Sequence, residues 1–165
     1  MITNGIWRRR LLTFLAAGLA VFLGSALAAA PARATLGAPQ PVNLQLRGYM
    51  GSTEILVGRA VGTIQLDDSN SAYQLSITLC RQSSYVAPTL RVSVNGVQQQ
   101  VFSGDDGVRR PSVCGDTFGQ SIAVNGTYGY SGVVRNMTIR LDGLFFDGST
   151  NTAYTKTKSA FYPFN

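Results

Sequence analysis

The chain has 165 residues with 14 Lys or Arg, 8 Asp or Glu, two cysteines and no histidine. Without an imidazole, it cannot assemble a Ser-His-Asp or Cys-His nucleophilic site or a histidine-ligated metal centre. Arg8, Arg9, Arg10 and Arg33 lie near the N-terminus, so residues 35–165 hold ten basic and eight acidic side chains, and their net charge of +2 excludes a strong attraction to nucleic acid or anionic membranes.

The first 34 residues have the pattern of a secretory signal peptide. A basic cluster, Arg8–Arg10, precedes the apolar stretch Leu11–Ala28, and small residues follow at Ala26–Ala28 and Ala32–Ala34. This order is typical of an export signal, because the apolar segment enters the membrane while the basic end stays on the cytoplasmic side. We expect residues 1–34 to be removed by cleavage after Ala34. Cleavage after Ala28 or Ala30, or retention as a membrane anchor, are the alternatives.

The export route stays open at this point. The stretch RRRLLTF, residues 8–14, resembles a twin-arginine signal, whereas an ordinary basic leader would use the general secretory route. An arginine-rich leader is typical of a bacterial protein, so we expect a periplasmic, secreted or cell-surface location without a stable membrane span after cleavage.

Residues 35–165 are predicted to form a single domain with one core. Its two cysteines, Cys80 and Cys114, are expected to form a disulfide, because an even number of cysteines in an exported protein indicates oxidised pairs. Free or metal-binding thiols are the alternative, but two sulfurs without a histidine do not complete a zinc site.

The segments that follow residue 41 alternate apolar and polar residues, which predicts strands. The first spans residues 42–50. The second spans residues 54–68, with a bulge or break at Gly58 or Gly62. A turn at residues 67–71 leads to a third strand at residues 72–80, in which Cys80 lies on the face opposite Leu79 or at the strand end.

Two Asn-Gly pairs predict hairpins further along the chain. Residues 89–103 alternate around Asn95-Gly96, and residues 120–132 contain Asn125-Gly126. Asn-Gly is the favoured two-residue hairpin turn because both residues adopt positive φ. Further strands are expected within residues 133–148 and 152–164. No helical period runs through the domain, so the sequence predicts an all-β fold: an antiparallel β-sandwich of about seven to nine strands, immunoglobulin-like or jelly-roll.

Two acidic turns are candidates for calcium. Carboxylate and amide oxygens from loops are the ligands that Ca²⁺ prefers. The sequence offers Asp67, Asp68 and Asn70 in one turn and Asp147 and Asn151 in another. The competing interpretation is a pair of hydrogen-bonded surface turns, which Asp, Asn and Ser commonly form. No other cofactor is expected.

Two further groups are candidates for ligand binding. Residues 104–119 form a glycine-rich stretch without periodicity, in which Asp105, Asp106, Arg109 and Arg110 would lie on a loop tied down by Cys114. Tyr128 and Tyr130, flanked by glycines, are candidates for stacking on sugar rings; the competing interpretation for both tyrosines is core packing.

The sequence therefore favours an exported, non-catalytic binding or surface module whose ligand is a carbohydrate or another surface protein. One alternative is a structural envelope or pilin-like subunit that assembles by strand addition. Another is a small secreted hydrolase that uses paired carboxylates. Composition and motifs favour no oligomeric state.

Overall fold

The computed structural model describes residues 35–104, 106–115, 120–147 and 152–164. The predicted signal peptide, residues 1–34, lies outside these ranges, as do Asp105 and Asn151. The chain divides into two units, Met1–Arg33 and Ala34–Asn165, and the described residues belong to the second unit. Within the described ranges, no helix is both long enough and apolar enough to cross a membrane.

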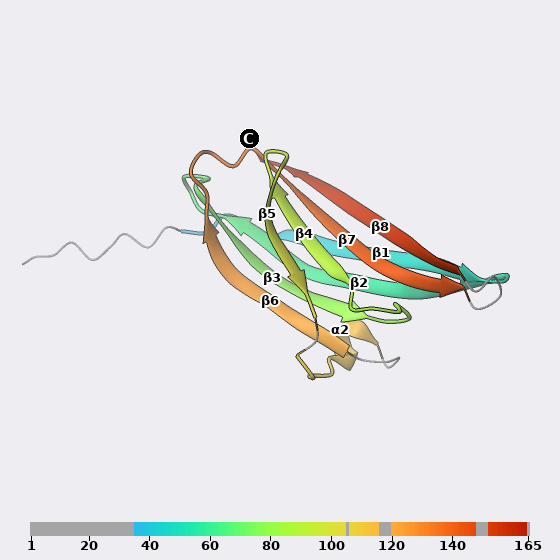
Figure 1. The fold of residues 1–165 in the computed structure, drawn as a ribbon. Coiled ribbons are helices and arrows are strands. Elements are labelled where there is room, and N and C mark those ends of the chain that lie inside the picture. Colours follow the sequence, from blue (N-terminus) through green and yellow to red (C-terminus); the bar gives the residue numbers. More distant parts are fainter. Residues whose placement is uncertain (1–34, 105, 116–119, 148–151, 165) are drawn as a thin grey trace, which may run out of the picture. The chain divides into compact units, whose positions relative to one another are not determined.

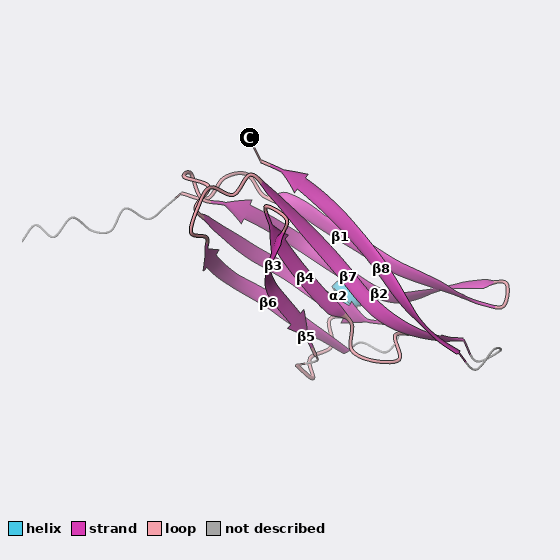
Figure 2. Ribbon diagram, turned by 45° about the horizontal axis from the view of Figure 1, so that its top comes forward, coloured by secondary structure: helices cyan, strands magenta, loops and turns pink. Residues whose placement is uncertain are grey.

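The described chain is nearly all β, as predicted, and its strands form two four-stranded antiparallel sheets (Figures 1 and 2). The first sheet has the order β1 (Gln40–Met50), β2 (Thr53–Leu66), β3 (Ala72–Arg81) and β6 (Gln120–Gly129). The second sheet has the order β5 (Val97–Ser103), β4 (Thr89–Val94), β7 (Asn136–Asp147) and β8 (Thr152–Pro163). One short helix, α2 (Pro111–Cys114), lies between β5 and β6 in the sequence.

Both sheets bury one face, because apolar residues alternate along their strands. In β7 the odd-numbered residues from Met137 to Phe145 are buried, while their even-numbered neighbours are more exposed. In β3 the residues from Tyr73 to Leu79 alternate in the same way. Buried side chains of both sheets belong to one hydrophobic cluster.

Contacts join the sheets along both sides. On one side, the Tyr162 hydroxyl of β8 donates to the Pro41 carbonyl of β1 over 3.1 Å. On the other side, the rings of Phe102 in β5 and Tyr128 in β6 meet edge to face, with centroids 6.0 Å apart.

The first predicted hairpin is confirmed, and the second is wrong. Asn95 and Gly96 have φ values of 51° and 82° and join β4 to β5. Asn125 and Gly126 instead lie inside β6, opposite Ser76 and Leu75 of β3. Pairing along the whole of β3 outweighs the local turn preference there. Glycine at 126 makes room, because a Cβ would lie 2.9 Å from the hydroxyl oxygen of Tyr128.

The predicted irregularity in β2 is confirmed beside Gly58. The β1–β2 register shifts there, since Leu46 pairs with Gly58 and Arg47 with Leu56, which leaves Val57 as the extra, buried residue. Gly62 has a different role. A Cβ at this position would lie 1.9 Å from the Ser76 carbonyl oxygen, so the close approach of β3 requires glycine.

The predicted disulfide between Cys80 and Cys114 is confirmed, with the two Cα atoms 5.5 Å apart. Cys80 follows Leu79 of the core face, so its side chain lies on the outer face of the first sheet, where the bond to α2 buries it. Arg59 of β2 donates to the Val113 carbonyl over 3.1 Å, and Gln82 donates to the Cys114 carbonyl. These contacts hold residues 106–115, the disulfide-pinned segment, against the first sheet.

Candidate functional site

The charges of the disulfide-pinned segment are mostly used to hold the segment itself. Arg110 donates Nη2 to Oδ2 of Asp106 over 2.6 Å and Nη1 to Oδ1 over 2.9 Å. Its Nη1 also donates to the buried Ser121 hydroxyl over 2.7 Å. Arg110 and the Val108 amide lower the pKa of Asp106, and Asp106 raises the pKa of Arg110. Among the described charged residues that were predicted to bind a ligand on this segment, only Arg109 is exposed and has no hydrogen bond or ion pair.

In the first acidic turn, the carboxylate of Asp67 is fully hydrogen-bonded by the turn itself. Asp67 is buried, and its two oxygens accept hydrogen bonds from the Ser69 and Ser71 hydroxyls and from the amides of Ser71 and Ala72, over 2.5–2.8 Å. The Ser69 hydroxyl and the Ala72 amide are the main causes that lower the pKa of Asp67 to about 2. Asp68 accepts from the Thr35 hydroxyl, and Asn70 sits in the turn with a φ of 52°.

The two acidic turns are not brought together. The Asn70 carbonyl accepts from the Val134 amide over 2.7 Å, close to the start of β7, whereas Asp147 is the last residue of that strand. Twelve strand residues span roughly 36 Å, so Asn70 and Asp147 lie at opposite ends of the domain, while Asn151 is outside the described residues. Among the described residues, no three His, Cys, Asp or Glu side chains are grouped so that they could hold a metal ion.

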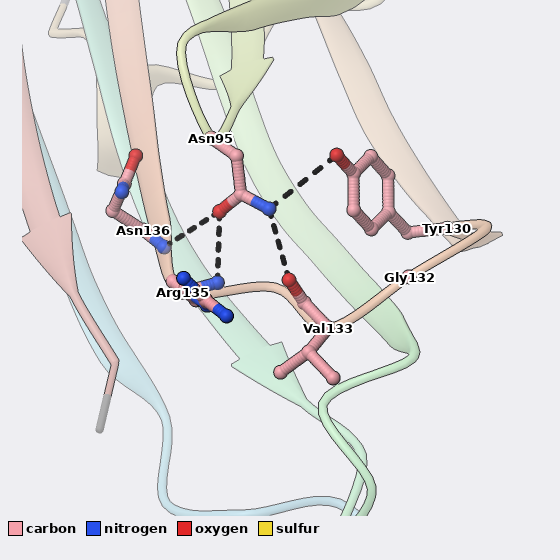
Figure 3. A pocket seen from close by; sticks show the side chains of 6 residues that line it. All are labelled: Asn95, Tyr130, Gly132, Val133, Arg135 and Asn136. Carbon is pink, nitrogen blue, oxygen red and sulfur yellow. Dashed lines mark hydrogen bonds between the residues drawn. The ribbon is translucent and has the colours of Figure 1, made fainter.

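The two candidate tyrosines have different surroundings. Tyr128 stacks on the buried Tyr73, with ring centroids 5.4 Å apart, and packs against the core. Tyr130 lines a shallow depression of about 440 Å³ together with Asn95, Gly132, Val133, Arg135 and Asn136 (Figure 3). Tyr130 therefore borders this hollow, whereas Tyr128 packs against the core.

Asn95 builds this depression. Its Nδ2 donates to the Val133 carbonyl over 2.9 Å and to the Tyr130 hydroxyl over 3.4 Å, and its Oδ1 accepts from the amides of Arg135 and Asn136 over 2.9 and 3.2 Å (Figure 3). The amide group is therefore saturated and serves to hold residues 130–136 against the β4–β5 turn. The groups left for a ligand are the Tyr130 ring, the Asn136 side chain and the exposed Arg135.

A second candidate surface is the outer face of the second sheet. It carries the side chains of the even-numbered residues of β7 and of the β4 and β8 residues that pair with them. The register places Arg91 of β4 opposite Arg140, and Thr157 of β8 opposite Asp142. Asp142 accepts from Nε of Arg140 over 2.7 Å, from Nε of Arg91 over 3.0 Å and from the Thr157 hydroxyl over 2.8 Å. Burial raises the pKa of Asp142, but the hydrogen bonds from the three donors lower it by more. The pKa is therefore below its ordinary value, and the carboxylate is ionised at neutral pH.

Exposed aromatic rings flank this polar centre. Phe161 of β8 pairs with Thr138, so its ring lies on the outer face, where it is 63% exposed. Phe146 lies on the same face near the other end of β7, and its ring is in contact with that of Tyr85, 5.8 Å away, which is 65% exposed. Thr138 and Phe146 are eight residues apart, so the two aromatic positions are separated by roughly 26 Å along the sheet.

The loop that carries Tyr85 is held by backbone hydrogen bonds. The Tyr85 amide donates to the Leu144 carbonyl of β7 over 2.7 Å, and the Ser84 amide donates to the Val57 carbonyl over 3.0 Å. Arg81 donates to the Ser84 and Tyr85 carbonyls over 2.9 and 2.8 Å. The exposed ring is therefore presented on a fixed backbone, which lowers the entropy lost when a ligand binds.

Sequence reasoning missed these three aromatic residues. A usable signal existed for Phe146, because adjacent phenylalanines at 145 and 146 in one strand must face opposite sides. Phe161 alternates in the same way with Tyr162. No pattern in the sequence places Tyr85 beside Phe146, since that contact depends on how the loop before β4 lies against β7.

Comparison with protein-family models, curated proteins and solved structures found no match to this chain.

Proposed function

We propose that the chain is an exported, non-catalytic β-sandwich module that binds a carbohydrate chain on the outer face of its second sheet. The strand order supports the immunoglobulin-like arrangement over the jelly roll. In the immunoglobulin fold, strands B and E pair in one sheet and strands C, F and G in the other. Here β3 and β6 pair in one sheet, and β4, β7 and β8 in the other, with the same chain order.

The observation that carries the proposal is the pair of exposed aromatic positions at the two ends of one polar sheet face. An exposed ring buries the apolar C–H face of a sugar while polar neighbours hydrogen-bond to its hydroxyl groups. Between Phe161 and Phe146 the outer face offers the hydroxyl groups of Thr138 and Thr157 and the guanidinium groups of Arg91 and Arg140. The spacing suits a chain of several sugars rather than one ring.

The acidic residues support binding rather than hydrolysis. A glycosidase needs two carboxyl groups that face each other across the sugar. Among the described acids, Asp67, Asp106 and Asp142 are each saturated by several donors. Glu54 forms an ion pair with Arg47 on the outer face of the first sheet, away from the proposed site. Each of these carboxylates already has a structural role.

The experiment compares two aromatic variants with a matched control in glycan-array and pull-down assays on polysaccharides. We expect Tyr85→Ala and Phe161→Ala each to weaken binding about tenfold, equivalent to ~1.4 kcal/mol. Tyr49→Ala is the control, since Tyr49 is 60% exposed but lies on the first sheet. Equal losses in all three variants, or binding that survives both substitutions, would count against the proposed site.

One observation supports the alternative function, assembly by strand addition. β5 is an edge strand without charge or proline, and Val97 and Val101 on it are exposed. Such an edge can pair with another chain, although the bulge at Gln99 disturbs its regular pairing. Size-exclusion chromatography at rising concentration distinguishes the two functions: a ladder of oligomers that Val101→Lys abolishes would favour assembly, and a monomer throughout would favour the binding module.

A further inference from the structure

We propose, on the basis of the carbohydrate function above, that the ligand is an acidic polysaccharide and that Arg140 and Arg91 recognise its anionic groups. The shared chemistry is a carboxylate or sulfate group carried on a sugar ring. The inference rests on three features of the outer face of the second sheet: the donors that the two arginines leave free, the surplus of positive charge, and the position of Arg140 beside Phe161.

Both arginines are fixed through Nε, which leaves terminal nitrogens for a ligand. The Arg140 side chain makes no hydrogen bond to the described residues other than the one from Nε to Asp142. Arg91 uses Nε on Asp142 and Nη1 on the Gln98 side chain, over 3.2 Å. Their side chains are 50% and 39% exposed. A guanidinium held in this way presents its remaining donors with little further loss of side-chain freedom, and such donors match carboxylate and sulfate oxygens.

The charge of this face is not balanced within the sheet. Within the described part of the chain, Asp142 is the only acidic partner of the two arginines, so the group of three side chains carries a net charge of +1. The other charged residues of β4, β5, β7 and β8 do not change this balance, because the register places Lys158 and Lys156 opposite the buried Leu141 and Gly143, on the other face of the sheet, which Asp147 shares. The Asp142 side chain is 14% exposed and its oxygens are taken by three donors. An incoming anion therefore meets free donors rather than a free carboxylate.

Arg140 is placed to act together with Phe161. Phe161 pairs with Thr138 and Ser159 pairs with Arg140, so Phe161 and Arg140 are diagonal neighbours on one face. Diagonal cross-strand neighbours lie about 7–8 Å apart, which is close enough for one sugar to contact both side chains. A ring stacked on Phe161 would thus bring its acidic substituent to the Arg140 guanidinium.

The test measures the affinity of the exported protein for matched polysaccharides at fixed ionic strength. The probes are polygalacturonate and its carboxyl-reduced form, and dextran sulfate and plain dextran. The variants are Arg140→Gln and the double variant Arg91→Gln with Arg140→Gln. Arg47→Gln is the control, because it removes the same charge from the outer face of the first sheet. Urea midpoints confirm that each variant is folded.

We expect at least one acidic polysaccharide to bind tenfold or more tightly than its uncharged counterpart, and the member of the pair that does so identifies carboxylate or sulfate as the recognised group. Arg140→Gln should remove most of this preference, while Arg47→Gln should keep it. Equal affinity for acidic and uncharged forms would overturn the inference but leave carbohydrate binding intact. An equal loss in Arg47→Gln would also overturn it, since the binding would then follow total charge. Failure to bind any polysaccharide would overturn both proposals.

Discussion

Arg91 and Arg140 lie directly opposite each other in the β4–β7 ladder, yet both donate Nε to the same carboxylate, that of Asp142. Like charges directly opposite each other destabilise a sheet, so this arrangement needs the shared acceptor. Asp142 holds both guanidinium groups near its own oxygens and leaves one unit of positive charge on the surface. The stability of the second sheet and its proposed ligand preference thus depend on one acidic side chain.

Asp142→Asn should lower the free energy of unfolding by about 1–3 kcal/mol, because it removes the charge that two arginines share and leaves them opposed. Urea denaturation at neutral pH measures the change. Glu54→Gln is the matched control: the Arg47–Glu54 ion pair is exposed on both sides, and such pairs contribute about 1 kcal/mol or less. An equal loss of unfolding free energy in the two variants would contradict the stabilising role of Asp142 between the two arginines.

Asp67 should make the domain sensitive to acid. Its pKa is lowered to about 2 in the folded chain from an ordinary value of 3.8, mainly by the Ser69 hydroxyl and the Ala72 amide. A carboxyl group with a lowered folded pKa contributes stability that is fully present above its unfolded pKa and is lost as the pH falls through the folded value. We therefore expect stability to fall between about pH 5 and pH 2. In Asp67→Asn this part of the pH dependence should disappear, and an unchanged slope in denaturation series across that range would contradict the assignment.

Removal of the Cys80–Cys114 disulfide should cost about 3–4 kcal/mol, the chain-entropy value for a loop closed by residues 34 apart. The double variant Cys80→Ala with Cys114→Ala, and the wild type with a reducing agent, should show the same loss in guanidinium denaturation. Hydrogen exchange should report faster opening of residues 106–115 while β7 stays protected. No difference between oxidised and reduced protein would show that the other contacts of this segment hold it without the bond.

Gly62→Ala should severely destabilise the domain, because the new Cβ would lie 1.9 Å from the Ser76 carbonyl oxygen, which is backbone and cannot move aside. Core clashes of this kind cost roughly 3 kcal/mol or more. Gly129→Ala is the control, since it lies in a strand of the same sheet and has no atom within 4 Å of its Cβ position. Thermal denaturation followed by circular dichroism should show a large decrease in Tm for the first variant only; similar Tm values would mean that β3 does not approach β2 so closely.

Much of the fold could be predicted because alternation survives in the sequence. The periods of two from residue 42 onward mark most of the strands, and the oxidised cysteine pair was expected from the number of cysteines and the predicted export signal. The two Asn-Gly pairs show where local rules fail. Both have the same turn preference, but Asn95 lies between short strands that pair with each other, whereas Asn125 lies opposite a long neighbour, β3, which pairs through it.

The candidate site was less accessible to prediction from sequence. The charge-rich turns were predicted to bind ligands, yet Asp67 and Asp106 accept hydrogen bonds from amides of their own loops. Short polar side chains commonly bond to nearby backbone amides in this way, which leaves fewer oxygens for a ligand. The glycine-rich surroundings of Tyr130 predict a surface segment, and Tyr130 lines the depression around Asn95, but its role as a ligand-binding residue stays a prediction. The partnership of Arg91 with Asp142, and of Tyr85 with Phe146, joins residues more than 50 positions apart. Those contacts follow from the pairing of β4 with β7, which a single sequence does not reveal.

The most direct test of the central claim is an amide chemical-shift titration of the ¹⁵N-labelled protein with an acidic oligosaccharide. If the outer face of the second sheet is the binding surface, the amides around Tyr85, Arg91, Arg140 and Phe161 should shift saturably, while those of Asn43 and Thr63 on the outer face of the first sheet should stay in place. Shifts confined to the first sheet or to residues 106–115 would contradict the account.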